Sequence, residues 1–94
     1  MIRRHVIITG GSGSVGAAAA RRFTALGDRV TIMATNTKDV EPLADEIGAR
    51  PVRIEVGDPA SVEAAFMAAG PADVLVNAAE MMKVGALVTT NVRT

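Results

Sequence analysis

The 94-residue chain is 49% hydrophobic and 21% charged, and its ten basic and ten acidic side chains cancel. This composition is typical of a globular protein, and we expect one small domain over residues 1–94. Zero net charge and only two aromatic residues, both Phe, argue against nucleic-acid binding, and no apolar run reaches the roughly 18 residues that span a membrane. Because cysteine is absent and histidine occurs once, the sequence excludes disulfides and predicts no metal site, and we expect a cytoplasmic protein.

The chain begins with a pattern of strand, helix and strand. Apolar residues 5–8 predict the first strand, the alanine-rich stretch 15–26 predicts a helix, and residues 30–33 predict the second strand. Gly27 stands where a left-handed helix cap is common, so the helix should end there. The residues expected on its buried face are Val15, Ala19, Phe23 and Leu26.

The second helix is expected to start at Asp39 and to end at Gly48. Asp39 is a good N-cap because Pro42 then falls in the first turn, where a missing N–H costs nothing. The apolar stripe of this helix consists of Val40, Leu43, Ala44 and Ile47.

A third strand and a third helix follow. Residues 52–56 alternate apolar and charged side chains, which predicts a strand at the edge of the sheet. Asp58 and Pro59 mark a helix start, Gly70 marks its end, and residues 74–76 predict the fourth strand. The buried stripe of the third helix should be Val62, Ala65, Phe66 and Ala69.

Strands separated by helices of this length imply right-handed crossovers between parallel strands. We therefore predict a Rossmann-like three-layer α/β fold, in which a parallel sheet of about four strands in the order 3-2-1-4 carries helices on both faces. Residues 81–94 place apolar side chains at helical spacing, but Val88, Thr89 and Thr90 are β-branched. We favour a helix there, and a strand is the alternative.

Residues 9–16 form a glycine-rich turn between the first strand and the first helix. Its glycines fit both G-x-G-x-x-G, starting at Gly11, and T-G-x-x-G-x-x-G, starting at Thr9. Glycines let backbone N–H groups approach a pyrophosphate, whose charge a helix N-terminus favours. Ala17 and Ala18 stand where a P-loop would need Lys and Ser or Thr. The turn therefore predicts a dinucleotide site, and a tight turn that binds nothing is the alternative. The residues expected at the cofactor here are Thr9, Gly10, Ser12, Gly13, Ser14, Val15 and Gly16.

With this motif, residues 6–94 resemble the N-terminal, cofactor-binding half of a short-chain dehydrogenase/reductase. The turn is similar to the T-G-x-x-G-x-x-G variant of extended and atypical members. Residues 73–80 resemble the family's D-x-L-V-N-N-A-G segment, which lies along the cofactor, although Ala78 and Glu80 depart from it. The resemblance implies that Asn77, Ala78 and Ala79 lie at the cofactor, with fewer amide contacts than in the family.

Two further segments extend the resemblance. Glu55 and Val56 take the place of the family's D-V pair, which meets the adenine; a solvated acid on an edge strand is the alternative. Asn91 takes the place of the active-site Asn in the family's N-V-x-G-T run, which implies a catalytic role. A polar residue near a chain end is the alternative for Asn91.

The cofactor preference of such folds is set just after the second strand. An acid there accepts hydrogen bonds from the adenosine ribose and repels a 2′-phosphate. Residues 34–38 contain no acid and include Lys38, so the sequence favours NADP, with NAD possible. Thr35 and Asn36 are the contacts expected in this loop, and an ordinary polar loop is the alternative.

The family's catalytic Tyr-x-x-x-Lys pair is missing, because these 94 residues contain no Tyr. We expect the chain alone to be inactive, and three functions stay open: the cofactor-binding half of an oxidoreductase, a stand-alone NADP(H)-binding regulatory module, or a structural remnant that binds no nucleotide. The apolar strand 74–76 should lie at the sheet edge. We therefore expect a homo-oligomer, or a partner chain that supplies the missing half.

Overall fold

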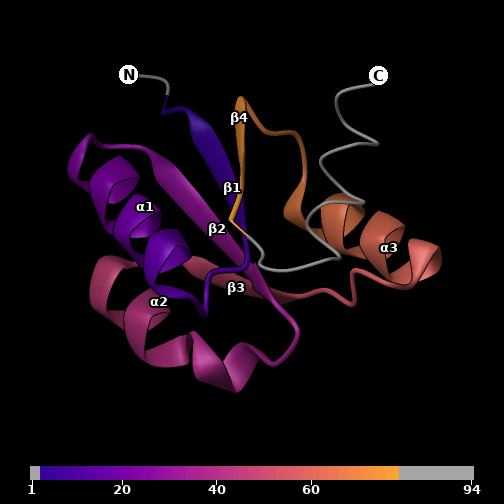
Figure 1. Cartoon of the computed structure of the whole chain (residues 1–94). Helices are drawn as coiled ribbons and strands as arrows, with labels where there is room; N and C mark the ends of the chain where they lie inside the picture. The colour runs from indigo at the N-terminus through magenta and orange to yellow at the C-terminus, as the bar shows by residue number, and fades with distance from the viewer. Residues whose placement is uncertain (1–2, 79–94) are drawn as a thin grey trace.

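Four parallel strands form one sheet in the computed structural model, which describes residues 3–78 (Figure 1). The order across the sheet is β3-β2-β1-β4, which confirms the predicted 3-2-1-4 arrangement. Its strands are β1 (His5–Thr9), β2 (Arg29–Ala34), β3 (Arg50–Arg53) and β4 (Val74–Asn77). Because all neighbouring strands are parallel, their carboxyl ends meet at one edge of the sheet.

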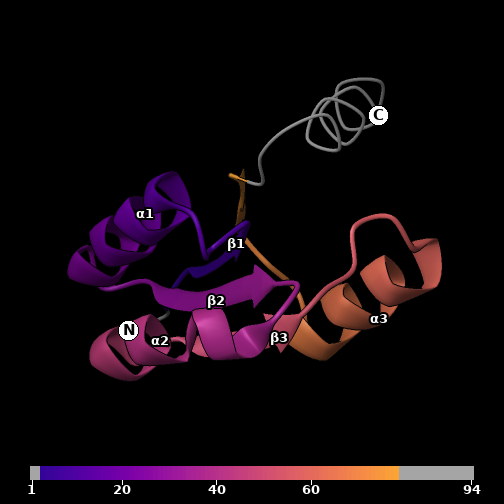
Figure 2. The ribbon, with the colours of Figure 1, turned by 60° about the horizontal axis from the view of Figure 1, so that its bottom comes forward.

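Helices cover both faces of this sheet, as predicted. The helices are α1 (Ser14–Ala25), α2 (Glu41–Ile47) and α3 (Pro59–Ala69), with a short 3-10 helix, η1 (Thr37–Asp39), ahead of α2. Figures 1 and 2 show α1 and α2 on one side of the sheet and α3 on the other. The described residues therefore form the three layers of a Rossmann-like fold.

Each face of the sheet buries its own hydrophobic cluster. Residues next to each other on a strand point to opposite faces, so Ile8 and Ile32 pack toward α1 and α2 whereas Ile7 and Met33 pack toward α3. This explains why β1 and β2 are apolar throughout: both faces of these strands are covered. The predicted stripes of α2 and α3 are confirmed, since their members are buried or pack against these clusters.

The stripe of α1 differs from the prediction. Ala19 and Phe23 pack against the sheet, but Val15 is 68% exposed and Leu26 is 54% exposed. Gly16 occupies the buried position in the first turn, because the glycine loop lies too close to α1 for a larger side chain. Leu26 is the C-cap, beyond the last helical turn that faces the sheet.

Helix ends were predicted with mixed success. Asp58 caps α3 through its side-chain Oδ1, which accepts from the Ala60 N–H at 3.0 Å, and Gly48 ends α2 with a φ of 74°. The prediction of Asp39 as an N-cap is wrong. Asn36 Oδ1 accepts from the Lys38 N–H and starts η1, so the chain already turns before Asp39 and Val40 precedes α2.

The third strand lies at the edge, as predicted, but two to three residues earlier in the chain. It spans Arg50–Arg53 rather than 52–56, because Arg50 already pairs with Thr31 of β2. The strand ends where the Glu55 N–H turns away from β2 and donates to Ser61 Oγ at 2.9 Å.

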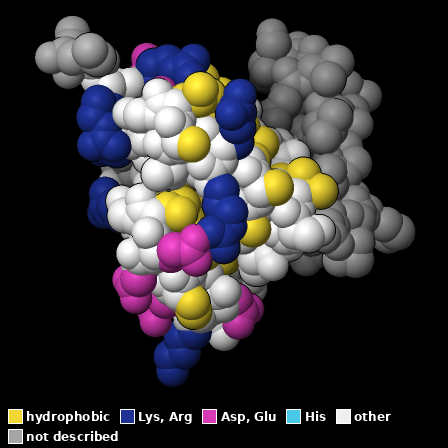
Figure 3. Space-filling model, turned by 90° about the vertical axis from the view of Figure 1, so that its left-hand side faces the viewer, with side chains coloured by type: hydrophobic (Ala, Val, Ile, Leu, Met, Phe, Trp, Pro, Cys, Tyr) yellow, Lys and Arg dark blue, Asp and Glu magenta, His cyan; other side chains and the backbone are white. Residues whose placement is uncertain are grey.

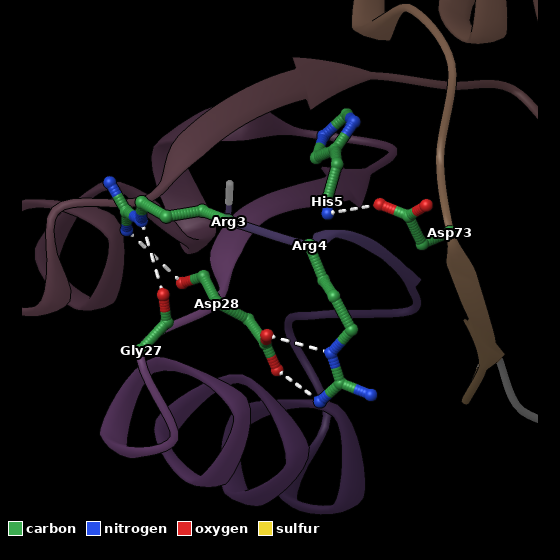
Figure 4. Close-up of polar contacts among 6 residues, drawn as sticks. All are labelled: Arg3, Arg4, His5, Gly27, Asp28 and Asp73. Atoms are coloured by element: carbon green, nitrogen blue, oxygen red, sulfur yellow. Dashed lines mark hydrogen bonds and ion pairs between the residues drawn. The ribbon is translucent and has the colours of Figure 1, made fainter. Parts of the chain in front are cut away.

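Polar side chains join the strands at the amino edge of the sheet (Figure 4). Arg4 donates to both carboxylate oxygens of the buried Asp28, with Nε to Oδ1 at 2.9 Å and Nη2 to Oδ2 at 2.7 Å. The hydrogen bonds to Arg4 and the positive charge of Arg4 lower the pKa of Asp28, and the hydrogen bonds to Asp28 and the negative charge of Asp28 raise the pKa of Arg4. The His5 N–H donates to Asp73 Oδ2 at 2.8 Å, which ties β1 to the start of β4.

The single histidine is a structural residue of the same edge. The buried His5 ring lies between two partners, with Nδ1 2.7 Å from the Pro71 carbonyl oxygen and Nε2 2.7 Å from Thr31 Oγ1. A carbonyl oxygen can only accept, so Nδ1 donates its proton to Pro71 and Nε2 accepts from the Thr31 hydroxyl in the neutral ring. Within residues 3–78 no group of three or more metal-ligating side chains occurs.

Candidate functional site

The predicted site residues that the structure describes gather at the carboxyl edge of the sheet. Each segment lies at the end of a strand or within three residues of it: the glycine turn begins at the end of β1, Thr35 and Asn36 follow β2, Glu55 and Val56 come shortly after β3, and β4 ends at Asn77. The chain leaves β1 toward α1 on one face, whereas β4 is reached from α3 on the other face (Figures 1 and 2). In open α/β sheets a crevice for a ligand forms where the chain reverses in this way.

The glycine turn folds tightly against β2. The N–H groups of Gly10 and Gly11 donate to the Met33 carbonyl at 3.1 and 3.3 Å, and Gly10 has a φ of 73°, which favours glycine. A Cβ on Gly11 would overlap the Ile32 side chain, and a Cβ on Gly16 would overlap the Gly10 carbonyl oxygen. Gly10, Gly11 and Gly16 therefore shape the turn, and their role is to allow close packing.

The N-terminus of α1 carries N–H donors that have no acceptor among residues 3–78. Gly13 is the N-cap but has no side chain to bond with, and the first turn contains no acidic residue. Among residues 3–78 no acceptor bonds the N–H groups of Ser12, Ser14 or Val15, and all three residues are exposed. Unpaired N–H groups at the positive end of a helix dipole form a binding site for an anion such as a phosphate.

Unlike Gly10 with its positive φ, Gly13 has a backbone conformation that does not require glycine. Its φ of −85° and ψ of 164° lie in the extended region, which any residue can adopt. A glycine is therefore not needed at this position for the turn itself. The absence of a side chain at Gly13 is consistent with space left for a ligand at the N-terminus of α1.

Thr9 and Asn77 connect the ends of β1 and β4. The buried Thr9 hydroxyl donates to Asn77 Oδ1 at 2.8 Å, and the Ala78 N–H donates to the Thr9 carbonyl at 3.0 Å. Asn77 Nδ2 has no partner among the described residues, so its amide can still donate to a ligand. Asn77 and Ala78 therefore lie beside the end of β1, where the glycine turn begins.

A small apolar pocket opens beside this pair, toward α3. It has a volume of about 90 Å³, and its wall combines three predicted site residues with four others. The predicted ones are Thr9, Val56 and Asn77, and the others are Ile54, Val62, Phe66 and Leu75. Sequence reasoning missed Leu75 as a site residue, because its strand pattern marks only an apolar residue and not the side of the sheet on which it lies.

The loop after β2 is polar and exposed. Thr35 is exposed, and the side-chain oxygen of Asn36 is occupied by the Lys38 N–H at 3.0 Å. Asn36 thus shapes the loop, and the Lys38 side chain carries the positive charge next to it. Glu55 is half-buried at the end of β3, and its N–H is held by Ser61, a residue to which the sequence assigned no role.

Several predictions lie outside the described residues. These are the cofactor contact Ala79, the catalytic Asn91 and the helix or strand within 81–94. In the described part of the chain, no helix has the length and apolar character needed to cross a bilayer.

Comparison with known proteins gives one consistent result. The model of the family described as "short chain dehydrogenase" matches residues 4–93. An L-xylulose reductase from Homo sapiens is 34% identical over 75 residues, which cover 79% of this chain and 31% of that protein. The oxidoreductase YuxG from Bacillus subtilis (strain 168) is 35% identical over 86 residues, which cover 80% of this chain and 12% of YuxG.

Solved structures agree with the sequence relatives. A 3-ketoacyl-(acyl-carrier-protein) reductase from Brucella melitensis, complexed with NADH, superposes with a TM-score of 0.71 at 32% identity, covering 77% of this chain and 32% of that one. The curated relatives are much longer, and the matches span only 12–31% of their length.

Proposed function

Because this chain belongs to the short-chain dehydrogenase family, we propose that it is the cofactor-binding segment of an oxidoreductase and that it holds NADP(H) at the carboxyl edge of its sheet. When bound, the nicotinamide of such a cofactor donates or accepts a hydride. The residues of this chain would bind the cofactor and orient it.

The observation that carries the proposal is the set of N–H groups at the start of α1 that find no acceptor in the described part of the chain. Ser12, Ser14 and Val15 offer these donors beside a glycine turn at the end of β1, with no acid in the first helical turn. A pyrophosphate fits this chemistry, because its oxygens accept hydrogen bonds and its charge complements the helix dipole. A turn that bound nothing would leave these N–H groups to water.

The remaining site residues follow along the same edge. Asn77 would donate through its amide Nδ2, which bonds to none of the described residues. Val56, in the wall of the apolar pocket, would offer an apolar surface near the adenine, with Glu55 beside it. Ala78 and Ala79 follow Asn77 and would lie along the cofactor. Asn91 would act as the family's active-site asparagine.

NADP is the cofactor that we favour over NAD. No acid lies between Ala34 and Asp39, so the loop lacks the carboxylate that would bind the ribose hydroxyls and repel a 2′-phosphate. Thr35 and Lys38 are exposed there and would contact the phosphate. A relative with NADH bound shows that the fold also accepts the cofactor without this phosphate, so the preference is a proposal.

The residues for proton transfer would come from outside these 94 residues, since the sequence contains no Tyr. They would lie on a longer form of the chain or on a partner, and the greater length of the relatives is consistent with this. The cytoplasmic location expected from the lack of cysteine also stays a prediction.

Isothermal titration calorimetry with NADPH tests the proposal. We expect the wild type to bind with micromolar or weaker affinity and Gly13→Val to abolish the heat, because the new side chain would occupy the space at the helix N-terminus while the extended backbone tolerates it. Ala18→Val, on an exposed position of the same helix, is the matched control and should bind like the wild type. Equal heats for wild type and Gly13→Val, or no heat from the wild type, would contradict the proposal.

A further inference from the structure

We propose that Arg53, at the end of β3, is a specificity residue that favours a dinucleotide bearing a 2′-phosphate over one without it. The inference rests on the proposed function and adds a residue that the sequence did not single out for cofactor binding.

The register of the sheet places Arg53 next to the loop 35–38, which would contact the adenosine ribose of the cofactor. Arg53 is the last residue of β3 and pairs with Ala34, the last residue of β2. The Ile54 N–H donates to the Ala34 carbonyl at 3.0 Å, which holds the two strand ends together. Arg53 therefore lies beside the point where the loop 35–38 begins, although it is 19 residues away from Ala34 along the chain.

The pleat of the strands decides the face on which Arg53 lies. Met33 and Val52 are paired and both belong to the cluster that packs on α3. Ala34, the next residue of β2, belongs to the cluster on the opposite face, under α1 and α2. Because neighbouring strand residues alternate, Arg53 lies on the same face as Ala34. The helix η1, which contains Lys38, contacts both β2 and β3, so the two basic residues belong to one corner of the fold.

Arg53 also differs in its bonding from most of the other arginines within residues 3–78. Arg4 and Arg21 are paired with carboxylates of Asp28 and Glu46, and Arg50, at the other end of β3, donates to the Ala68 carbonyl at 2.9 Å. The Arg53 side chain is exposed and makes no hydrogen bond or ion pair with residues 3–78. No structural contact within that range accounts for its charge.

The chemistry of the guanidinium fits a phosphate monoester. A 2′-phosphate carries nearly two negative charges, and an arginine can donate two parallel hydrogen bonds to it. Figure 3 shows the side of the molecule that carries α1 and α2, where basic and acidic side chains lie next to one another, so this face has no uniform charge. The acids nearest in sequence to Lys38 and Arg53 are Asp39 in η1 and Glu55 after β3. Their negative charges repel a phosphate, so both basic residues are needed to favour NADP over NAD.

Calorimetric titration of the wild type and of Arg53→Gln with NADPH and with NADH tests the inference. We expect Arg53→Gln to weaken NADPH binding by about 10- to 100-fold and to leave NADH binding unchanged, because only NADPH carries the charged acceptor. Arg53→Lys should retain part of the preference. Arg22→Gln, which removes an exposed charge on α1, is the matched control and should change neither affinity.

The outcomes separate the inference from the function on which it rests. If Arg53→Gln weakens both dinucleotides equally, or neither, the inference is overturned while dinucleotide binding stands. If the wild type binds neither dinucleotide, both fail. Thermal unfolding of Arg53→Gln should match the wild type, since no bond within residues 3–78 is lost; a lower midpoint would identify a structural role instead.

Discussion

The hydroxyl of Thr9 donates to the side-chain oxygen of Asn77 at 2.8 Å, and this bond joins the ends of two strands that are 68 residues apart in the chain. It holds Asn77 beside the glycine turn, and the Asn77 amide nitrogen has no partner between residues 3 and 78.

Thr9→Val should therefore destabilise the protein and weaken dinucleotide binding. The variant keeps the shape of Thr9 but removes the donor to Oδ1 of the half-buried Asn77, which costs about 0.5–1.5 kcal/mol, the net contribution of an ordinary hydrogen bond. Thr24→Val is the matched control, because Thr24 Oγ1 is buried without a partner in the described part of the chain, so its removal should be neutral or stabilising. Urea unfolding of the two variants measures the difference. A Thr9→Val protein as stable as the wild type would show that the bond contributes little.

Gly16→Ala should lower stability more than Gly13→Ala. A Cβ on Gly16 would overlap the Gly10 carbonyl oxygen and come within 2.9 Å of the Gly11 Cα, so the turn or α1 must shift, at a cost of about 1–3 kcal/mol. Gly13 has an extended backbone that accepts alanine. Thermal unfolding compares the two. Equal midpoints would mean that the turn adjusts without strain.

The Arg4–Asp28 pair should make stability depend on pH. Asp28 has a pKa below its ordinary value of 3.8, so its contribution is fully present above that pH and is lost as the pH falls through the lower value in the folded protein. Arg4→Gln removes the partner, so the variant should melt below the wild type at pH 7 and the gap should narrow in strong acid. Midpoints measured from pH 7 down to about 2 test this. A gap that stayed constant across the range would contradict it.

The isolated 94-residue chain should not reduce carbonyl compounds or oxidise alcohols. General acid catalysis by a positioned side chain contributes about 10²- to 10⁴-fold, and the tyrosine that the family uses does not occur in this sequence. The measurement is the decrease in NADPH absorbance when the chain is mixed with each of a panel of carbonyl substrates. Sustained turnover that copurifies with the chain through repeated chromatography would show that another residue carries the proton.

The edge of β4 should make the chain self-associate. β4 ends the described sheet, and Leu75 on it is 47% exposed. Sedimentation at low micromolar concentration should show a dimer for the wild type and a monomer for Leu87→Lys, because the sequence predicts that the apolar segment 81–92 takes part in the pairing. Met67→Lys, on α3 and 76% exposed, should remain dimeric as the control. A wild-type monomer would refute self-association.

Much of this architecture could be predicted from the sequence, because its signals are local. Alternating apolar runs and helical stripes, with Gly27, Gly48 and Gly70 at the helix ends, predict the elements, and the handedness of crossovers then leaves few orders for the strands. The glycine turn predicts an anion site for the same reason, since its pattern and its place between strand and helix lie within a dozen residues.

Tertiary structure decided the rest, because it depends on which distant residues meet. The bond between Thr9 and Asn77 and the pairing of Arg53 with Ala34 follow from strand register, which no local pattern shows. The helical stripe predicted that Val15 is buried, but the glycine turn packs against Gly16, which takes the buried position in the first turn of α1, and Val15 is exposed. Periodicity tells which side chains can share a face, and only packing decides which of those faces is covered and which residues from distant segments lie together at the site.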